Sequence, residues 1–105
     1  MGVPVYRVAS IEQVPRGGYK VIYFRNKEIV ILNHNNRYYA LDNLCPHRQA
    51  ALCHGEISDG ALVCPWHGAR FELETGKGLP GPHQTDIGSY TVTSENGDIL
   101  LSERG

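Results

Sequence analysis

Residues 45–71 read CPHRQAALCHGEISDGALVCPWHGARF and contain two short boxes that each combine a cysteine with a histidine. The first box is Cys45-Pro46-His47 and the second is Cys64-Pro65-Trp66-His67. Thiolate sulfur and imidazole nitrogen suit soft and borderline metals, and two loops at the tips of neighbouring hairpins can converge on one site. The stretch therefore predicts a metal site whose ligands are Cys45, His47, Cys64 and His67.

On both sides of this stretch, short segments rich in Val, Ile, Tyr, Phe and Thr alternate with turn residues, which is typical of an antiparallel β meander. A capping-box pattern at Ser10-Ile11-Glu12-Gln13 predicts one short helical turn. We expect strands at residues 3–8, 19–24, 28–32, 37–41, 61–63, 70–74, 87–93 and 98–102. Residues 42–55 are predicted to be irregular.

The chain has 105 residues, of which 41% are hydrophobic and 20% charged, and this composition predicts a single domain over residues 1–105. Its ten basic and eleven acidic residues are scattered, so they do not form the basic stripe of a nucleic-acid-binding protein. No apolar run is long enough to span a membrane, and the N-terminus lacks the pattern of a secretory signal. Three cysteines cannot all form internal disulfides, so we expect a cytoplasmic protein whose thiols serve metal or redox chemistry.

The boxes resemble those of the Rieske family, and in particular the Rieske-type ferredoxins that supply electrons to bacterial aromatic-ring dioxygenases. Here they read CPHRQAAL at 45–52, followed by Gly55, and CPWHGARF at 64–71, followed by Thr75-Gly76. Leu79-Pro80-Gly81-Pro82 resembles the proline-containing loop of the family. In a Rieske centre two cysteines hold one iron and two histidines hold the other. The resemblance thus implies one 2Fe-2S cluster on Cys45, His47, Cys64 and His67.

The resemblance also implies an all-β fold, a Rieske-like antiparallel β sandwich. A small cluster-binding subdomain of two loops, at about residues 43–83, would be inserted in the base domain. The implied function is that of a monomeric one-electron carrier, which accepts electrons from a flavin-dependent ferredoxin reductase and passes them to a terminal oxygenase. An enzyme would need room for a substrate and an open metal position or an acid-base pair, and this chain shows neither.

One departure from the wider family concerns the reduction potential. Respiratory-complex Rieske proteins carry a further cysteine in each box, and these places are held here by Gln49 and Trp66. They also carry hydroxyl groups near the cluster sulfurs, whereas Ala69 follows His67-Gly68 in this chain. Because hydrogen bonds to the sulfurs stabilise the reduced cluster, their scarcity predicts a low potential for a Rieske protein.

Two other functions are compatible with the boxes. One is the small Rieske-like subunit of an assimilatory nitrite reductase, although some members of that group lack the ligands and this chain has all four. The other is a zinc-stabilised or redox-sensing interaction module, because two cysteines and two histidines also satisfy tetrahedral zinc. Iron and sulfide analysis with EPR separates the zinc module from the two electron-transfer proteins.

The remaining candidate residues are given structural roles. Cys53 is interpreted as a small packing residue or a free thiol, and Trp66 as support beneath the second box. His54 and His83 are interpreted as surface histidines.

Overall fold

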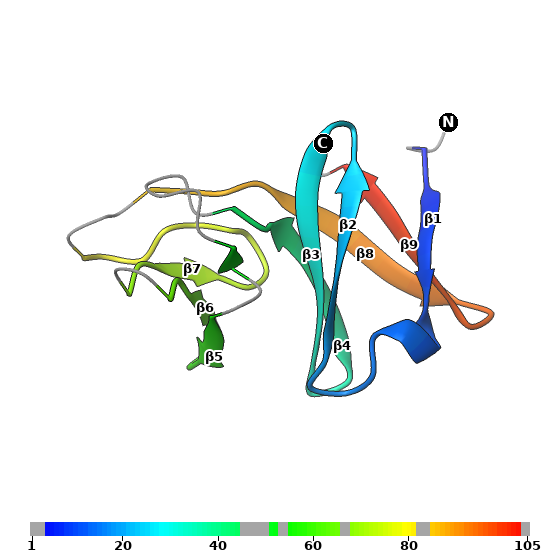
Figure 1. Cartoon of the computed structure of the whole chain (residues 1–105), viewed down its shortest axis with the longest axis horizontal. Helices are drawn as coiled ribbons and strands as arrows, with labels where there is room; N and C mark the ends of the chain where they lie inside the picture. The colour runs from blue at the N-terminus through cyan, green and yellow to red at the C-terminus, as the bar shows by residue number, and fades with distance from the viewer. Residues whose placement is uncertain (1–3, 45–50, 53–54, 66–67, 82–84, 104–105) are drawn as a thin grey trace.

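The computed structural model contains two antiparallel sheets that lie side by side (Figure 1). The structure describes residues 4–44, 51–52, 55–65, 68–81 and 85–103. The larger sheet has the strand order β1-β9-β8-β4-β3-β2 and the smaller has the order β5-β6-β7. The large-sheet strands are β1 (Tyr6–Ser10), β2 (Tyr19–Phe24), β3 (Lys27–His34), β4 (Arg37–Asp42), β8 (Ser89–Glu95) and β9 (Asp98–Glu103). The small-sheet strands are β5 (Glu56–Ser58), β6 (Ala61–Val63) and β7 (Arg70–Glu72).

Strand β3 is buried on both faces, because it separates two hydrophobic cores. Successive side chains of a strand point to opposite faces, so its apolar run divides between them. Ile29 and Ile31 belong to the first core, whose other buried members are Ala9, Val14, Ile22, Ala40, Ile99 and Leu101. Val30 and Leu32 belong to the second core, whose other buried members are Leu41, Leu52, Leu62, Cys64, Phe71, Leu73 and Ile87.

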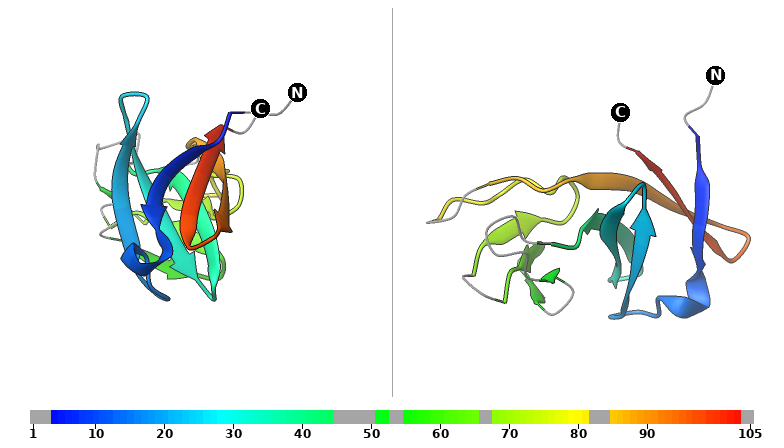
Figure 2. Two further views of the ribbon diagram at one scale, coloured as in Figure 1. Left: turned by 90° about the vertical axis from the view of Figure 1, so that its right-hand side faces the viewer. Right: turned by 45° about the horizontal axis from the view of Figure 1, so that its top comes forward.

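The first core is enclosed by the large sheet itself. Apart from Val14, its buried residues come from β1, β2, β3, β4 and β9, so the sheet must curl around them, and the end view in Figure 2 (left) shows this curl. The second core lies between the large sheet and the small one. The two sheets therefore pack against each other through the face of β3 and β4 that carries Val30, Leu32 and Leu41.

Four hairpins turn through two residues that both have positive φ. The pairs are Arg25-Asn26, Asn35-Asn36, Asp59-Gly60 and Asn96-Gly97. Such turns match the right-handed twist of the flanking strands, and Asn, Asp and Gly tolerate the left-handed region best. These short turns fix the register of each hairpin, so each strand keeps its apolar residues on the core side.

The predicted all-β antiparallel class is confirmed, with several corrections to the strands. The first strand covers Tyr6–Ser10 rather than residues 3–8, because it pairs with β9 through Asp98 and Leu101. β3 and β4 are longer than predicted, since their turn is only Asn35-Asn36. β7 ends at Glu72 and a turn follows at 73–75. Strand β5 was not predicted.

The predicted capping box is present at the start of a short helical turn. A short 3-10 helix covers Ile11–Gln13, and the Gln13 side chain accepts a hydrogen bond from the Ser10 backbone N–H at 3.0 Å.

In the chain order, all three strands of the small sheet lie between β4 and β8. A separate cluster-binding subdomain at about 43–83 stays a prediction. Within the described residues, no helix is long and apolar enough to cross a bilayer.

Candidate metal centre

Cys64 is the one predicted ligand that falls within the described residues. It directly follows β6, is only 2% exposed and packs in the second core with Leu62 and Phe71. Among the residues that the structure describes, its thiol is free. Cys45, His47 and His67 lie outside the described residues, as do Cys53, His54, Trp66 and His83. The four-ligand set therefore stays a prediction, to which the structure adds a buried, unpaired cysteine.

The second box forms a loop whose ends are held together by backbone hydrogen bonds. The Cys64 N–H donates to the Ala69 carbonyl at 2.7 Å, and the Gly68 N–H donates to the Cys64 carbonyl at 3.2 Å. Gly68 has a φ of +69°, which glycine adopts without steric cost. The chain thus leaves β6 at Cys64 and returns to β7 immediately after Ala69, so Cys64 is fixed at the base of the loop.

The first box is also closed at its base. Leu44 and Ala51 form an isolated antiparallel bridge, and the Leu52 N–H donates to the Asn43 carbonyl at 2.5 Å. Asn43 is fully buried, and its side-chain amide donates to the Glu28 carboxylate at 2.5 Å. Cys45 directly follows Leu44 in the chain, and Leu44 is held by this bridge.

The bases of the two loops belong to the same part of the molecule. Leu52, at the end of the first loop, and Cys64, at the start of the second, are both buried in the second core. Gly55 lies against β6 so closely that a Cβ atom there would be 1.9 Å from the Val63 carbonyl oxygen. Gly55, Val63, Cys64 and Gly68 are among the residues that line a hollow of about 420 Å³.

The segment that leads to Leu79-Pro80-Gly81-Pro82 is fastened to β7. Phe71 and Gly78 form a bridge, and the Leu79 N–H donates to the Arg70 carbonyl at 2.9 Å. The Gly78 N–H also donates to the Asp86 carboxylate at 2.8 Å, across the segment. Residues 82–84 lie outside the described residues, so the predicted covering of the cluster by this loop stays a prediction.

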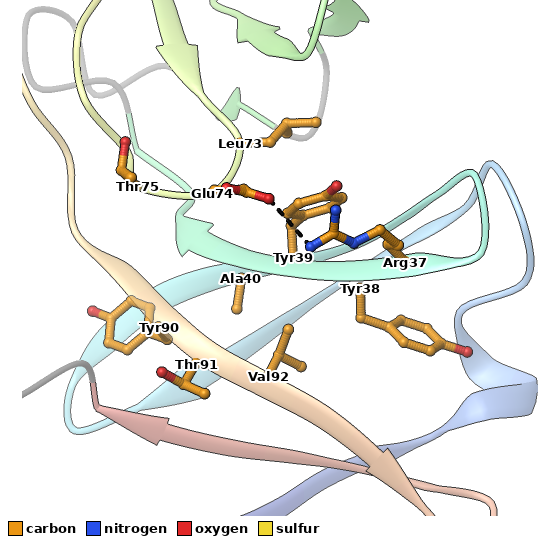
Figure 3. Close-up of a pocket in the computed structure, with 10 residues that line it drawn as sticks. All are labelled: Arg37, Tyr38, Tyr39, Ala40, Leu73, Glu74, Thr75, Tyr90, Thr91 and Val92. Carbon is orange, nitrogen blue, oxygen red and sulfur yellow. Dashed lines mark hydrogen bonds and ion pairs between the residues drawn. The ribbon is translucent and has the colours of Figure 1, made fainter.

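A second hollow, a groove of about 320 Å³ between β4 and β8, lies apart from these loop bases (Figure 3). The Arg37 guanidinium crosses it and donates to the Glu74 carboxylate at 3.2 Å. Both side chains are more than half exposed, so this ion pair contributes little stability. No predicted ligand is among the described residues that line the groove, and we assign it no part in the metal site.

The residues around Cys64 fit a Rieske-type cluster. A buried cysteine with a free thiol, such as Cys64, can supply a thiolate to iron. A second cysteine, Cys45, directly follows Leu44, which lies at the base of the other loop. The boxes are evident in the sequence, whereas the pair of Glu28 and buried Asn43 that braces the first loop is not. An Asn next to a box carries no periodic signal, so its burial could not be read from the sequence.

Comparisons with known proteins agree with this geometry. Residues 4–91 match the Rieske [2Fe-2S] domain. The ferredoxin component of the naphthalene 1,2-dioxygenase/salicylate 5-hydroxylase systems of Ralstonia sp is 34% identical over 93 residues, 89% of each chain. The 3-phenylpropionate/cinnamic acid dioxygenase ferredoxin subunit of Photorhabdus laumondii is 31% identical over 96 residues, 90% of each chain.

A solved structure extends the similarity to the fold. The ferredoxin of carbazole 1,9a-dioxygenase from Nocardioides aromaticivorans IC177 superposes with a TM-score of 0.85 at 26% identity, over 95% of this chain and 98% of that one. The resemblance inferred from the two boxes is thereby confirmed. The chain belongs to the Rieske [2Fe-2S] domain family, whose cofactor is one Rieske-type 2Fe-2S cluster.

Proposed function

We propose that this protein is a one-electron carrier whose Rieske cluster is held by Cys45 and Cys64 on one iron and by His47 and His67 on the other. The observation that carries the proposal is the buried, unpaired Cys64 at the base of a hydrogen-bonded loop, beside the base of the loop that begins with Cys45. Membership of the Rieske family supplies the identity of the cofactor.

The cluster, when bound, supplies reversible one-electron chemistry. The protein contributes two thiolates and two imidazoles. Neutral imidazoles in place of two thiolates remove about two negative charges, which makes the added electron more stable than in a four-cysteine ferredoxin. The buried side chains of Leu52, Leu62 and Phe71 keep water from the side of Cys64 that faces the second core.

We further propose that the electrons go to a terminal oxygenase and come from a flavin-dependent ferredoxin reductase in the cytoplasm. The relatives in Ralstonia and Photorhabdus are named ferredoxin components of dioxygenase systems, and this chain matches them over most of their length. A protein with that role is a component of a multicomponent oxygenase rather than an enzyme by itself. The protein is proposed to act as a monomer.

Reconstitution tests the cofactor directly. The full chain, incubated anaerobically with iron and sulfide, should bind about two irons and two acid-labile sulfides and should give a Rieske EPR signal after reduction with dithionite. A colourless protein that binds zinc in place of iron would show instead the zinc-stabilised module. A protein that binds neither would also overturn the proposal.

Carrier and enzyme subunit are separated by a turnover experiment. A reductase and oxygenase from a naphthalene dioxygenase system, supplied with NADH, oxygen and naphthalene, should form product in amounts that greatly exceed the amount of this protein added. With the oxygenase in large molar excess over this protein, reduction of most of the oxygenase requires the protein to move between partners. A reconstituted protein that accepts electrons from no reductase of this class, and that instead co-purifies in fixed ratio with a nitrite reductase, would favour the subunit.

A further inference from the structure

The carboxylate of Asp42 holds together two segments that are far apart in the chain. Its Oδ2 atom accepts a hydrogen bond from the Gly88 N–H at 2.9 Å, and its Oδ1 atom accepts one from the Tyr90 hydroxyl at 2.7 Å. The Asp42 N–H donates to the Gly88 carbonyl at 2.9 Å. Asp42 therefore contacts the β8 side through both its backbone and its carboxylate.

The location of these contacts connects them with the candidate metal centre. Asp42 is the last residue of β4 and precedes Cys45 by three positions. Gly88 directly precedes β8, after the segment 76–87 that contains the proline-containing loop. The ladder between β4 and β8 consists of only Ala40–Tyr90 and Leu41–Ser89. The Asp42 contacts extend this short ladder at the end where both strands lead to the loops.

The local structure is built closely around the Asp42 carboxylate. A Cβ atom at position 88 would lie 2.7 Å from Asp42 Oδ2, so any residue other than glycine there would require the carboxylate to shift. The Tyr90 ring packs edge-on against Phe24 at 6.2 Å between ring centroids, which restrains the ring that carries the donating hydroxyl. In Figure 3 the Tyr90 hydroxyl points away from the Arg37–Glu74 ion pair.

We propose that Asp42 is a positioning residue for the cluster. By binding Gly88 and Tyr90, it holds the end of the proline-loop segment against the start of the loop that carries Cys45 and His47. Hydrogen bonds to an ionised carboxylate are stronger than those between neutral groups, so one side chain can fasten both segments. This inference rests on the proposed function, because it concerns how firmly the protein retains the proposed cluster.

The mildest test is Tyr90→Phe, which removes the hydroxyl that donates to Asp42 and keeps the ring. A second variant, Asp42→Asn, keeps one acceptor oxygen but replaces the other with an amide NH2 group. This group faces either the Gly88 N–H or the Tyr90 hydroxyl, both of which donate to Asp42 in the wild type. The matched controls are Tyr23→Phe, at a tyrosine that is 78% exposed, and Glu12→Gln, which removes one negative charge in the 3-10 helix beyond β1. All four variants are reconstituted as the full holoprotein.

Three quantities are measured: the rate of cluster loss into an excess of an iron chelator, the EPR spectrum of the reduced cluster and the rate of unfolding. We expect Asp42→Asn to release its cluster about tenfold faster than the wild type. Losses of this size are typical when a group that supports metal ligands is removed. Tyr90→Phe should accelerate release in the same direction. Both should alter the EPR line shape, and both controls should match the wild type.

Two results would overturn the inference. One is that both test variants release the cluster at the wild-type rate and give the wild-type EPR spectrum. The other is a faster release that is matched by an equal rise in the unfolding rate with an unchanged EPR spectrum, because this would be general destabilisation. A wild-type protein that forms no Rieske cluster would instead contradict the proposed function, so the two failures are distinguishable.

Discussion

At the scale of single residues, the sequence identifies the predicted ligands of the site more clearly than the residues that support the two loops. The paired boxes are sufficient to predict the four ligands, because cysteine and histidine are uncommon and their spacing is compact. The supporting contacts of Asp42 and Asn43 are different. They join residues up to 48 positions apart, and both partners are ordinary polar residues. Nothing in the sequence distinguishes them from exposed polar residues, so only the fold reveals their role.

Cys64 and Cys53 provide the first prediction at this scale. Cys64→Ser should abolish the Rieske absorbance and EPR signal, because it replaces a proposed thiolate ligand at the base of the second loop. Cys53→Ser is the matched control and should keep the cluster, since Cys53 is interpreted as a packing residue or a free thiol. Iron content per chain measures both. A Cys64→Ser protein with a normal Rieske spectrum would remove Cys64 from the ligand set.

Gly55 provides the second prediction. A methyl group at this position would lie 1.9 Å from the Val63 carbonyl oxygen, and this oxygen belongs to backbone that cannot easily move. We expect Gly55→Ala to lower the free energy of unfolding of the holoprotein by about 1–3 kcal/mol, the usual cost of overpacking. Chemical denaturation measures it.

The matched control for this variant is Gly81→Ala, because a Cβ atom at Gly81 would meet no atom within 4 Å. Its stability should stay within about 0.5 kcal/mol of the wild type, as for most surface substitutions. Equal losses in the two variants would show that the close approach of Gly55 to Val63 does not determine the effect.

At the scale of secondary structure, the sequence predicts strands well where apolar segments are bounded by Asn, Asp or Gly. The strands expected at residues 19–24 and 61–63 coincide with β2 and β6, which adjoin the turns at Arg25-Asn26 and Asp59-Gly60. Strand β5 was missed because Glu56–Ser58 is only three residues long and has one apolar side chain. Its strand conformation comes from pairing with β6, a tertiary contact that local sequence preference does not encode.

The two cores lead to a prediction at this scale. Leu62 on β6 and Ile99 on β9 are both almost fully buried, but Leu62 packs in the core that contains Cys64, whereas Ile99 packs in the other core. Each substitution to alanine should cost about 2–5 kcal/mol of unfolding free energy. Only Leu62→Ala should also accelerate cluster loss into a chelator.

The comparison between these two variants is decisive because their loss of stability is similar. If Ile99→Ala released its cluster as fast as Leu62→Ala, cluster retention would depend on global stability. The division of the protein into a core beside the metal centre and a core within the large sheet would then have no functional meaning.

At the scale of the whole molecule, fold and family agree with the expectation from the two boxes. The all-β class, the Rieske family and the ferredoxin relatives were each anticipated from the sequence. The packing of the small sheet against β3 and β4 could not be anticipated, because it depends on which face of each strand is covered. The double burial of β3 is the clearest consequence of that packing.

The central claim is that sulfur ligands hold one iron and nitrogen ligands hold the other. The most direct measurement is pulsed EPR on the dithionite-reduced protein, prepared once with ordinary histidine and once with histidine that carries heavy nitrogen in its ring. The account predicts strong couplings from two histidine nitrogens that change with the isotope. A reduced cluster without isotope-sensitive couplings would contradict the account, because no histidine nitrogen would then be bound to iron.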